Sequence, residues 1–179
     1  ACLLPYEACN LSSVNVSRFA ANGAIDFARL RDTVRLGVRF LDDVIDVNDY
    51  VPNIPQIRQQ TRGNRKIGLG IMGFADPLIE MGISYGDTLA MKIDDTLMSF
   101  IQKNAREMSK ELARERGCFP NWEKSVFFPD TPIRNACVTS IAPTGTLSII
   151  AGCSPGIEPL FGVAYHRNVL DGKKLLEVN

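Results

Sequence analysis

A short polar stretch of this sequence has the composition of an anion-binding loop. It consists of Pro143, Thr144, Gly145, Thr146, Leu147 and Ser148. It follows residues 135–141, whose alternation predicts a strand, and α/β folds bind ligands at the carboxyl ends of strands. Three hydroxyls can donate hydrogen bonds, and Gly145 lets the backbone approach an anion. The stretch has no lysine, so it is not a Walker A loop, and an ordinary turn remains an equal alternative.

Cysteine is the second residue type that could do chemistry. The sequence holds five cysteines, namely Cys2, Cys9, Cys118, Cys137 and Cys153. No two of them form a C-x-x-C pair, and His166 is the single histidine, so we expect no metal site. Unpaired cysteines without a disulfide framework suit a reducing, cytoplasmic setting.

Two glycine motifs resemble known sites but lack the required context. Residues 68–73 match G-x-G-x-x-G, yet no useful strand precedes them and Asp76-Pro77 is expected to interrupt the following helix. We interpret them as a tight strand-to-helix passage. Residues 152–156 match G-x-S-x-G, but Pro155 has no N–H for an oxyanion hole. We therefore expect a glycine-rich turn and no hydrolase.

Two long helices must position these residues. Asp26 is a candidate cap for a helix that ends near Asn48, and Asp87 opens a longer helix that ends at Gly117. The expected apolar face of the second helix consists of Leu89, Ile93, Leu97, Phe100 or Ile101, Ala105, Met108 and Leu112. Residues 9–20 predict a short strand or extended loop, and residues 143–148 a turn-rich loop. Strands mixed with long helices indicate the α/β class.

Composition excludes several classes of function. The 179 residues are 45% hydrophobic and 22% charged, with a formal net charge of zero. A neutral chain argues against a non-specific nucleic-acid binder, and no apolar run is long enough for a membrane span. The sequence does not begin with methionine and its first methionine is Met72, which fits either a processed or trimmed chain or a segment of a longer one, and we expect the segment.

Several long strings resemble one enzyme family. Residues 3–11 read LLPYEACNL, which resembles the segment after the finger-loop motif Asn-Pro-Cys-Gly-Glu in cobalamin-dependent (class II) ribonucleotide reductases. Further similar strings are RKIGLGIMGFAD at 65–76, IAPTGTLSIIAGCSPGIEPLF at 141–161, and residues 165–179. The resemblance covers nearly the whole chain, and the length of these strings makes it specific.

The resemblance implies a fold and a reaction. Residues 1–179 would form part of a ten-stranded α/β barrel with a finger loop through its centre. The complete enzyme would replace the ribose 2′-hydroxyl of a ribonucleotide with hydrogen. Adenosylcobalamin would generate a thiyl radical that abstracts the 3′-hydrogen, and two further cysteines would supply electrons and become a disulfide.

Site residues follow from the same resemblance. Cys9 matches the later member of the redox pair, and residues 143–148 match the substrate diphosphate loop. The radical cysteine would lie just before Ala1, so the isolated chain is expected to be inactive. Cys118 and Cys137 match no catalytic position and are expected to be small buried residues. The role of Cys153 stays open.

Partners and alternatives complete these expectations. The resemblance implies a ribonucleotide substrate, a dithiol reductant such as thioredoxin, and allows a homodimer, with no nucleic acid and no membrane. Diphosphate and triphosphate substrates stay open. A class I large subunit and a catalytically silent phosphate-binding module are the alternatives. Ser12 stands where the family usually has glycine, and it would cost about 1 kcal/mol or more if that position has positive φ.

Overall fold

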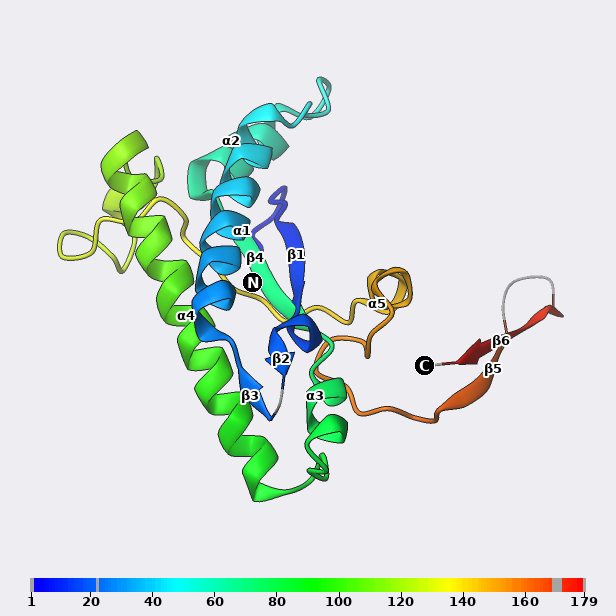
Figure 1. Cartoon of the computed structure of the whole chain (residues 1–179). Coiled ribbons are helices and arrows are strands. Elements are labelled where there is room, and N and C mark those ends of the chain that lie inside the picture. The colour runs from blue at the N-terminus through cyan, green and yellow to red at the C-terminus, as the bar shows by residue number, and fades with distance from the viewer. Residues whose placement is uncertain (1, 22, 169–171, 179) are drawn as a thin grey trace.

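Two parallel strands and two long helices form the centre of this chain in the computed structural model (Figure 1). The structure describes residues 2–21, 23–168 and 172–178. The elements in chain order are β1 (Asn10–Asn15), the 3₁₀ turn η1 (Val16–Phe19), β2 (Ala20–Ala21), β3 (Ala24–Ile25), α1 (Phe27–Val47), α2 (Pro55–Asn64), β4 (Ile67–Met72), α3 (Ala75–Glu80), α4 (Thr88–Arg116), the 3₁₀ turn η2 (Trp122–Lys124), α5 (Gly145–Ala151), β5 (Ala164–Asn168) and β6 (Lys174–Val178).

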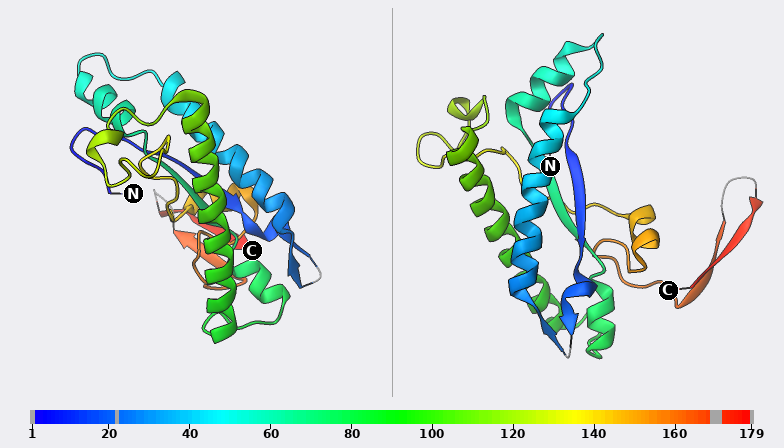
Figure 2. Two further views of the ribbon diagram at one scale, coloured as in Figure 1. Left: turned by 90° about the vertical axis from the view of Figure 1, so that its left-hand side faces the viewer. Right: turned by 45° about the horizontal axis from the view of Figure 1, so that its top comes forward.

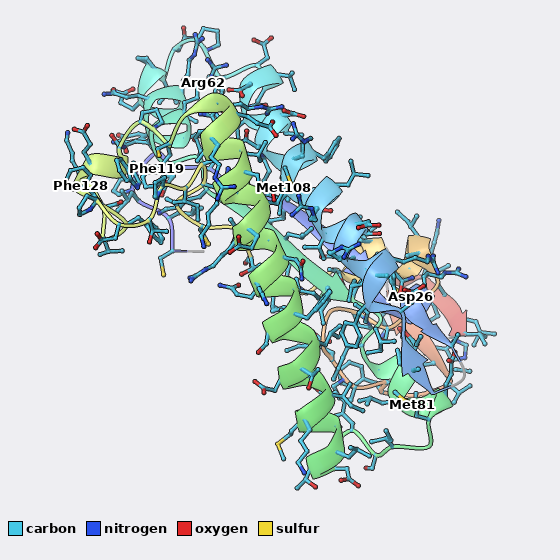
Figure 3. The ribbon with its side chains drawn as sticks, turned by 60° about the vertical axis from the view of Figure 1, so that its left-hand side comes forward. Asp26, Arg62, Met81, Met108, Phe119 and Phe128 are labelled. Carbon is cyan, nitrogen blue, oxygen red and sulfur yellow. The ribbon has the colours of Figure 1, made fainter. Side chains whose placement is uncertain are left out.

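Helix α1 confirms the predicted cap at Asp26 and the predicted end near Asn48. The Asp26 carboxylate accepts a hydrogen bond from the Arg29 amide at 3.0 Å, and Asn48 ends the helix. Figure 3 shows Asp26 at the start of α1. The buried residues recur every three or four positions; they are Leu30, Val34, Val38, Leu41 and Ile45. This face packs on β1 and β4.

Helix α4 lies alongside α1 in every view (Figures 1 and 2). Asp87 caps it by accepting from the Leu89 amide at 2.9 Å, and Gly117 ends it with φ of 84°, as predicted. Most of the predicted face is buried, including Leu97, Ile101 and Leu112. Leu89, in the first turn, is 49% exposed, and Ile93 and Phe100 are partly buried.

The central sheet is parallel. β1 pairs with β4 in a register that runs from Asn10 opposite Ile67 to Asn15 opposite Met72. Ser12 lies in this extended strand and is not among the positive-φ residues, so serine fits without backbone strain. The mixed α/β class is confirmed, but no sheet among the described residues closes into a barrel.

The predicted strand at residues 135–141 is largely wrong. The segment runs beside β4, where the Ile67 amide donates to the Cys137 carbonyl and the Leu69 amide to the Val138 carbonyl, both at 2.9 Å. Only Thr139 forms a bridge, to Leu69. The Asn135 side chain is buried and hydrogen-bonded to the side chains of Ser109 and Asp42. These side-chain hydrogen bonds, instead of backbone pairing with a strand, fix this end of the segment.

The glycines of the first motif lie inside β4. A Cβ on Gly68 would lie 2.5 Å from Cδ2 of Leu11, and a Cβ on Gly70 would lie 2.2 Å from the Ser140 carbonyl oxygen. These glycines therefore allow close backbone approach within the strand, and the expected passage into a helix follows directly after it. Gly73, with φ of 74°, makes the turn into α3.

Helix α2 was not predicted, whereas α3 follows the expected strand-to-helix passage. α2 begins with Pro55 at its first turn, and α3 contains Pro77 in its first turn, where a missing N–H breaks no helical hydrogen bond. Asp76-Pro77 therefore does not interrupt a helix, contrary to our expectation. At the other end of the chain, β5 and β6 form an antiparallel hairpin that extends away from the central sheet (Figure 1). No helix in the described part of the chain is long and apolar enough to cross a membrane.

A buried ionic network joins four segments at the start of β4. Asp42 of α1 is 0% exposed, and its carboxylate accepts from Arg65 Nε and from Asn135 Nδ2, each at 2.9 Å. Arg116 and Arg134 donate to its second oxygen. Arg65 also bonds Asp46 at 2.8 Å, which lowers the pKa of that carboxyl. Sequence reading missed this network, although an aspartate beside Leu41 on the apolar face of α1 was its signal.

We predict that Gly70→Ala destabilises the fold by about 1–3 kcal/mol, because its Cβ would overlap the Ser140 carbonyl. Gly86→Ala is the matched control, since nothing lies within 4 Å of the added carbon. Urea unfolding of the three proteins measures the effect. Equal free energies of unfolding would show that residues 139–141 can move away at no cost.

Arg65→Met is predicted to lower the free energy of unfolding by about 3–5 kcal/mol, since it leaves the buried Asp42 carboxylate without its main partner. The control is Arg39→Met, which breaks the partly exposed pair with Glu115 and should cost about 0–1 kcal/mol. A loss no larger than that of the control would mean that Arg116 and Arg134 suffice for Asp42.

Candidate functional site

Cys9 lies directly before β1 and is half-buried. Its Sγ donates to the Asn10 carbonyl oxygen at 3.4 Å. Burial raises the pKa of this thiol, and Cys137 nearby raises it further. All five cysteines lie in described residues and are free thiols. Cys9 is therefore a protonated, partly accessible thiol at neutral pH, which can donate hydrogen before it acts as a thiolate.

The other cysteines differ in their surroundings. Cys118 and Cys137 are half-buried, so the expectation that they are buried is only partly met. The Cys137 thiol donates to the Thr139 carbonyl at 3.5 Å. Cys153, whose role was open, is buried, and the pKa of its thiol is raised by burial and then by the charge of Asp76.

The predicted phosphate stretch is the start of a helix and not a turn-rich loop. Thr144 adopts the left-handed conformation, with φ of 54°, and Gly145 begins α5. Leu147, Ile149 and Ile150 of this helix are exposed, so the sequence shows no apolar periodicity that would have revealed it.

Two of the predicted hydroxyls form hydrogen bonds to nearby backbone groups. Thr144 is buried, and its hydroxyl oxygen accepts from the Gly156 amide at 2.7 Å. Ser148 is also buried, and its hydroxyl donates to the Gly145 carbonyl at 3.2 Å. These two bonds tie together the backbone between residues 143 and 156, with the Thr144 hydroxyl as acceptor and the Ser148 hydroxyl as donor.

The outward groups are those of Thr146 and the first amides of α5. Thr146 is exposed, and its hydroxyl makes no hydrogen bond to any described residue. In the first intrahelical bond of α5, the Ser148 amide donates to the Thr144 carbonyl at 2.8 Å. Three residues of the helix come before that amide, namely Gly145, Thr146 and Leu147. Their N–H groups have no intrahelical acceptor, which makes them available to an external anion.

A cavity of about 360 Å³ lies beside this stretch. Its lining includes Pro143, Gly145, Ser148, Cys153, Glu158 and Tyr165. Ser154 next to Cys153 is fully buried, and its hydroxyl donates to Asp76 at 3.0 Å. This pairing agrees with our rejection of a serine nucleophile at G-x-S-x-G, because the hydroxyl points into the protein and not into the cavity.

Cys9 and the phosphate stretch lie at different ends of the parallel strands. Cys9 precedes the first residue of β1, whereas residues 143–148 follow the bridge between Thr139 and Leu69. The structure therefore brings Thr144 and Ser148 together, but it does not place Cys9 in contact with either of them.

Comparison with known proteins gives a consistent result. Residues 2–130 and 128–179 match the family model described as "Ribonucleotide reductase, barrel domain". The chain is 52% identical over 179 residues to a vitamin B12-dependent ribonucleoside-diphosphate reductase of Thermoplasma acidophilum. The aligned region covers 99% of this chain and 23% of that protein. The enzyme of the same name from Mycobacterium tuberculosis is 49% identical, over 99% of this chain and 25% of its own length.

A more distant relative has a different name. The ribonucleoside-diphosphate reductase subunit alpha of Chlamydia pneumoniae is 30% identical over 92% of this chain and 19% of its own length. The chain thus spans about a quarter or less of the curated relatives that it matches.

Proposed function

This chain belongs to the family of ribonucleotide reductase barrel domains, and we propose that it forms part of an enzyme that reduces ribonucleotides to 2′-deoxyribonucleotides. The observation that supports this proposal is the sequence identity of 52% and 49% to two vitamin B12-dependent reductases, over 99% of the chain in each case. The lower identity, 30%, to an alpha subunit favours the cobalamin-dependent kind over the class I alternative. The names of these relatives also favour a diphosphate substrate.

We further propose that β1 and β4 are strands of a ten-stranded barrel completed by other parts of a full-length reductase. Bound adenosylcobalamin would supply the radical chemistry. Among the described residues, no group of three or more His, Cys, Asp or Glu side chains is placed to hold a metal ion, and a corrin brings its own cobalt. We therefore assign no residue of this chain to the cofactor.

Cys9 is proposed as one of two thiols that reduce the substrate. In the net reaction, two thiols and a ribonucleotide give a disulfide, a deoxyribonucleotide and water. The second thiol would lie elsewhere in the full-length reductase. The raised pKa of Cys9 supports this role, because the thiol keeps its hydrogen at neutral pH. A dithiol such as thioredoxin would then reduce the disulfide. A homodimer and a cytoplasmic location stay predictions.

Residues 143–148 are proposed to bind the substrate diphosphate. The stretch has no cationic side chain, so binding would depend on the amides of Gly145, Thr146 and Leu147 and on the Thr146 hydroxyl. Thr144 and Ser148 would act by holding the backbone, since their hydroxyls are bonded internally. This division of roles refines the expectation that all three hydroxyls bind substrate.

We predict that Cys9→Ser in the full-length reductase abolishes steady-state reduction by dithiol, because serine cannot form the disulfide. Radical formation should persist, since it belongs to another cysteine. Deoxynucleotide yield and electron paramagnetic resonance measure the two properties. Cys118→Ser, another half-buried cysteine, is the control and should keep turnover. Normal turnover of Cys9→Ser would remove Cys9 from the reaction.

Thr146→Val in the same enzyme is predicted to raise the substrate dissociation constant about 10- to 100-fold, because a charge-assisted hydrogen bond contributes roughly 1.5–3 kcal/mol. Cobalamin affinity should stay nearly unchanged. Thr33→Val, at an exposed threonine on α1, is the matched control. Unchanged substrate affinity would mean that Thr146 does not face the phosphates, and loss of both ligands would mean that it supports folding instead.

A further inference from the structure

A buried carboxylate lies two residues before Cys9. The side chain of Glu7 is 0% exposed, and both of its oxygens accept hydrogen bonds. The donors are the Leu4 amide at 2.7 Å, Asn64 Nδ2 at 2.8 Å and Lys66 Nζ at 2.8 Å. A carboxylate is tolerated in a buried place only when its acceptors are filled in this way. Hydrogen bonding outweighs the effect of burial, so the pKa of Glu7 is lowered and it is ionised at neutral pH.

The donors tie the Glu7 segment to the start of β4. Asn64 is the last residue of α2, and Lys66 directly precedes β4. Lys66 also donates to the Cys2 carbonyl at 2.7 Å, and the Asn64 side-chain oxygen accepts from Asn121 at 2.9 Å. We refer to this group of three residues, Glu7, Asn64 and Lys66, as the Glu7 clamp. The clamp holds a segment that has no other regular structure before β1.

The residues on both sides of Cys9 are also anchored. The Ala8 amide donates to the Thr61 hydroxyl at 3.1 Å, and Asn10 Nδ2 donates to the Leu41 carbonyl at 3.0 Å. Asn10 begins the parallel ladder opposite Ile67, next to Lys66. The position of the Cys9 thiol therefore depends on a backbone that the clamp fixes on one side and the sheet on the other.

The clamp also acts electrostatically on Cys9. Among the smaller influences on the Cys9 thiol, the charge of Glu7 raises its pKa and the charge of Lys66 lowers it. Both charges therefore affect the pKa of the Cys9 thiol. Removing either charge should shift that pKa.

We propose that Glu7 is a positioning residue for Cys9, which acts with Lys66 and Asn64 to hold the thiol where it can form a disulfide with its redox partner. This inference rests on the proposed function, because it presumes that Cys9 is a reducing thiol. In this role Glu7 would act through the position of the Cys9 thiol. Substrate binding should be independent of the clamp, because residues 143–148 lie at the other end of the strands.

The test uses Glu7→Gln, Lys66→Gln and the double variant in the full-length reductase. The rate at which iodoacetamide alkylates Cys9 would be followed by mass spectrometry against pH. Glu7→Gln removes a negative charge, so the profile should move to lower pH. Lys66→Gln removes a positive charge and should move it to higher pH, with the double variant between them. A purely structural fastening would not give shifts of opposite sign.

Turnover is the second readout. Displacing a reacting group by about 1 Å can reduce a rate about 100-fold, so we expect kcat with dithiol to fall about 10- to 100-fold in Glu7→Gln while KM stays unchanged. Glu107→Gln is the matched control, because Glu107 pairs with Lys110 on the exposed surface of α4 at 2.9 Å. It should change neither the profile nor kcat. If Glu7→Gln does not fold, Lys66→Gln provides the same two readouts.

Unchanged profiles and unchanged kcat in both single variants, with Cys9→Ser inactive, would overturn the positioning role alone. Full turnover in Cys9→Ser would overturn the proposed role of Cys9, whatever the clamp variants do. A rise in KM equal to the fall in kcat would also contradict the proposal, because it would indicate a general disturbance of the barrel.

Discussion

The buried carboxylate of Asp42 is the constraint on which the arrangement of this chain depends. A charge with no exposure must be matched by donors, and those donors come from segments distant in sequence: Arg65 before β4, Arg116 at the end of α4, and Asn135 ahead of the segment beside β4. Meeting this requirement fixes where α1, α4 and β4 lie relative to one another. It also explains why Arg65 accepts a left-handed backbone, with φ of 49°, at the end of α2.

The start of β4 is therefore held from two sides. Arg65 faces the Asp42 network, whereas its neighbours Asn64 and Lys66 face Glu7 and the approach to Cys9. β1 and β4 run in parallel from this fixed point to their carboxyl ends. The segment that leads to α5 bridges to β4 at Thr139 and then leaves the sheet near those ends. Glycines 68 and 70 let that segment approach closely. One short strand thus relates the thiol at one end to the candidate anion site at the other.

Local chemistry explains which features the sequence could predict. Asp26, Asp87 and Gly117 cap helices through contacts within a few residues, and Pro155 rules out an oxyanion hole by its own covalent structure. The errors arose where distant contacts decide. α2 is polar and α5 exposes its apolar residues, so neither shows helical periodicity. The strand expected at 135–141 is replaced by side-chain bonds of Asn135 to Asp42 and Ser109, which no local pattern reveals.

Ionic groups buried in this way contribute little net stability, because desolvation offsets most of their attraction. Their consequence is geometric, since a carboxylate with several fixed donors has few alternative arrangements. Asp42 and Glu7 show this at two neighbouring cations, because Asp42 pairs with Arg65 and Glu7 pairs with Lys66. A disulfide forms only when two sulfurs meet at a restricted distance and angle, so the proposed redox role of Cys9 would need geometry of this kind more than stability. Of the two carboxylates, Glu7 is the one whose donors lie beside the Cys9 segment, whereas the Asp42 network holds α1, α4 and the start of β4 together.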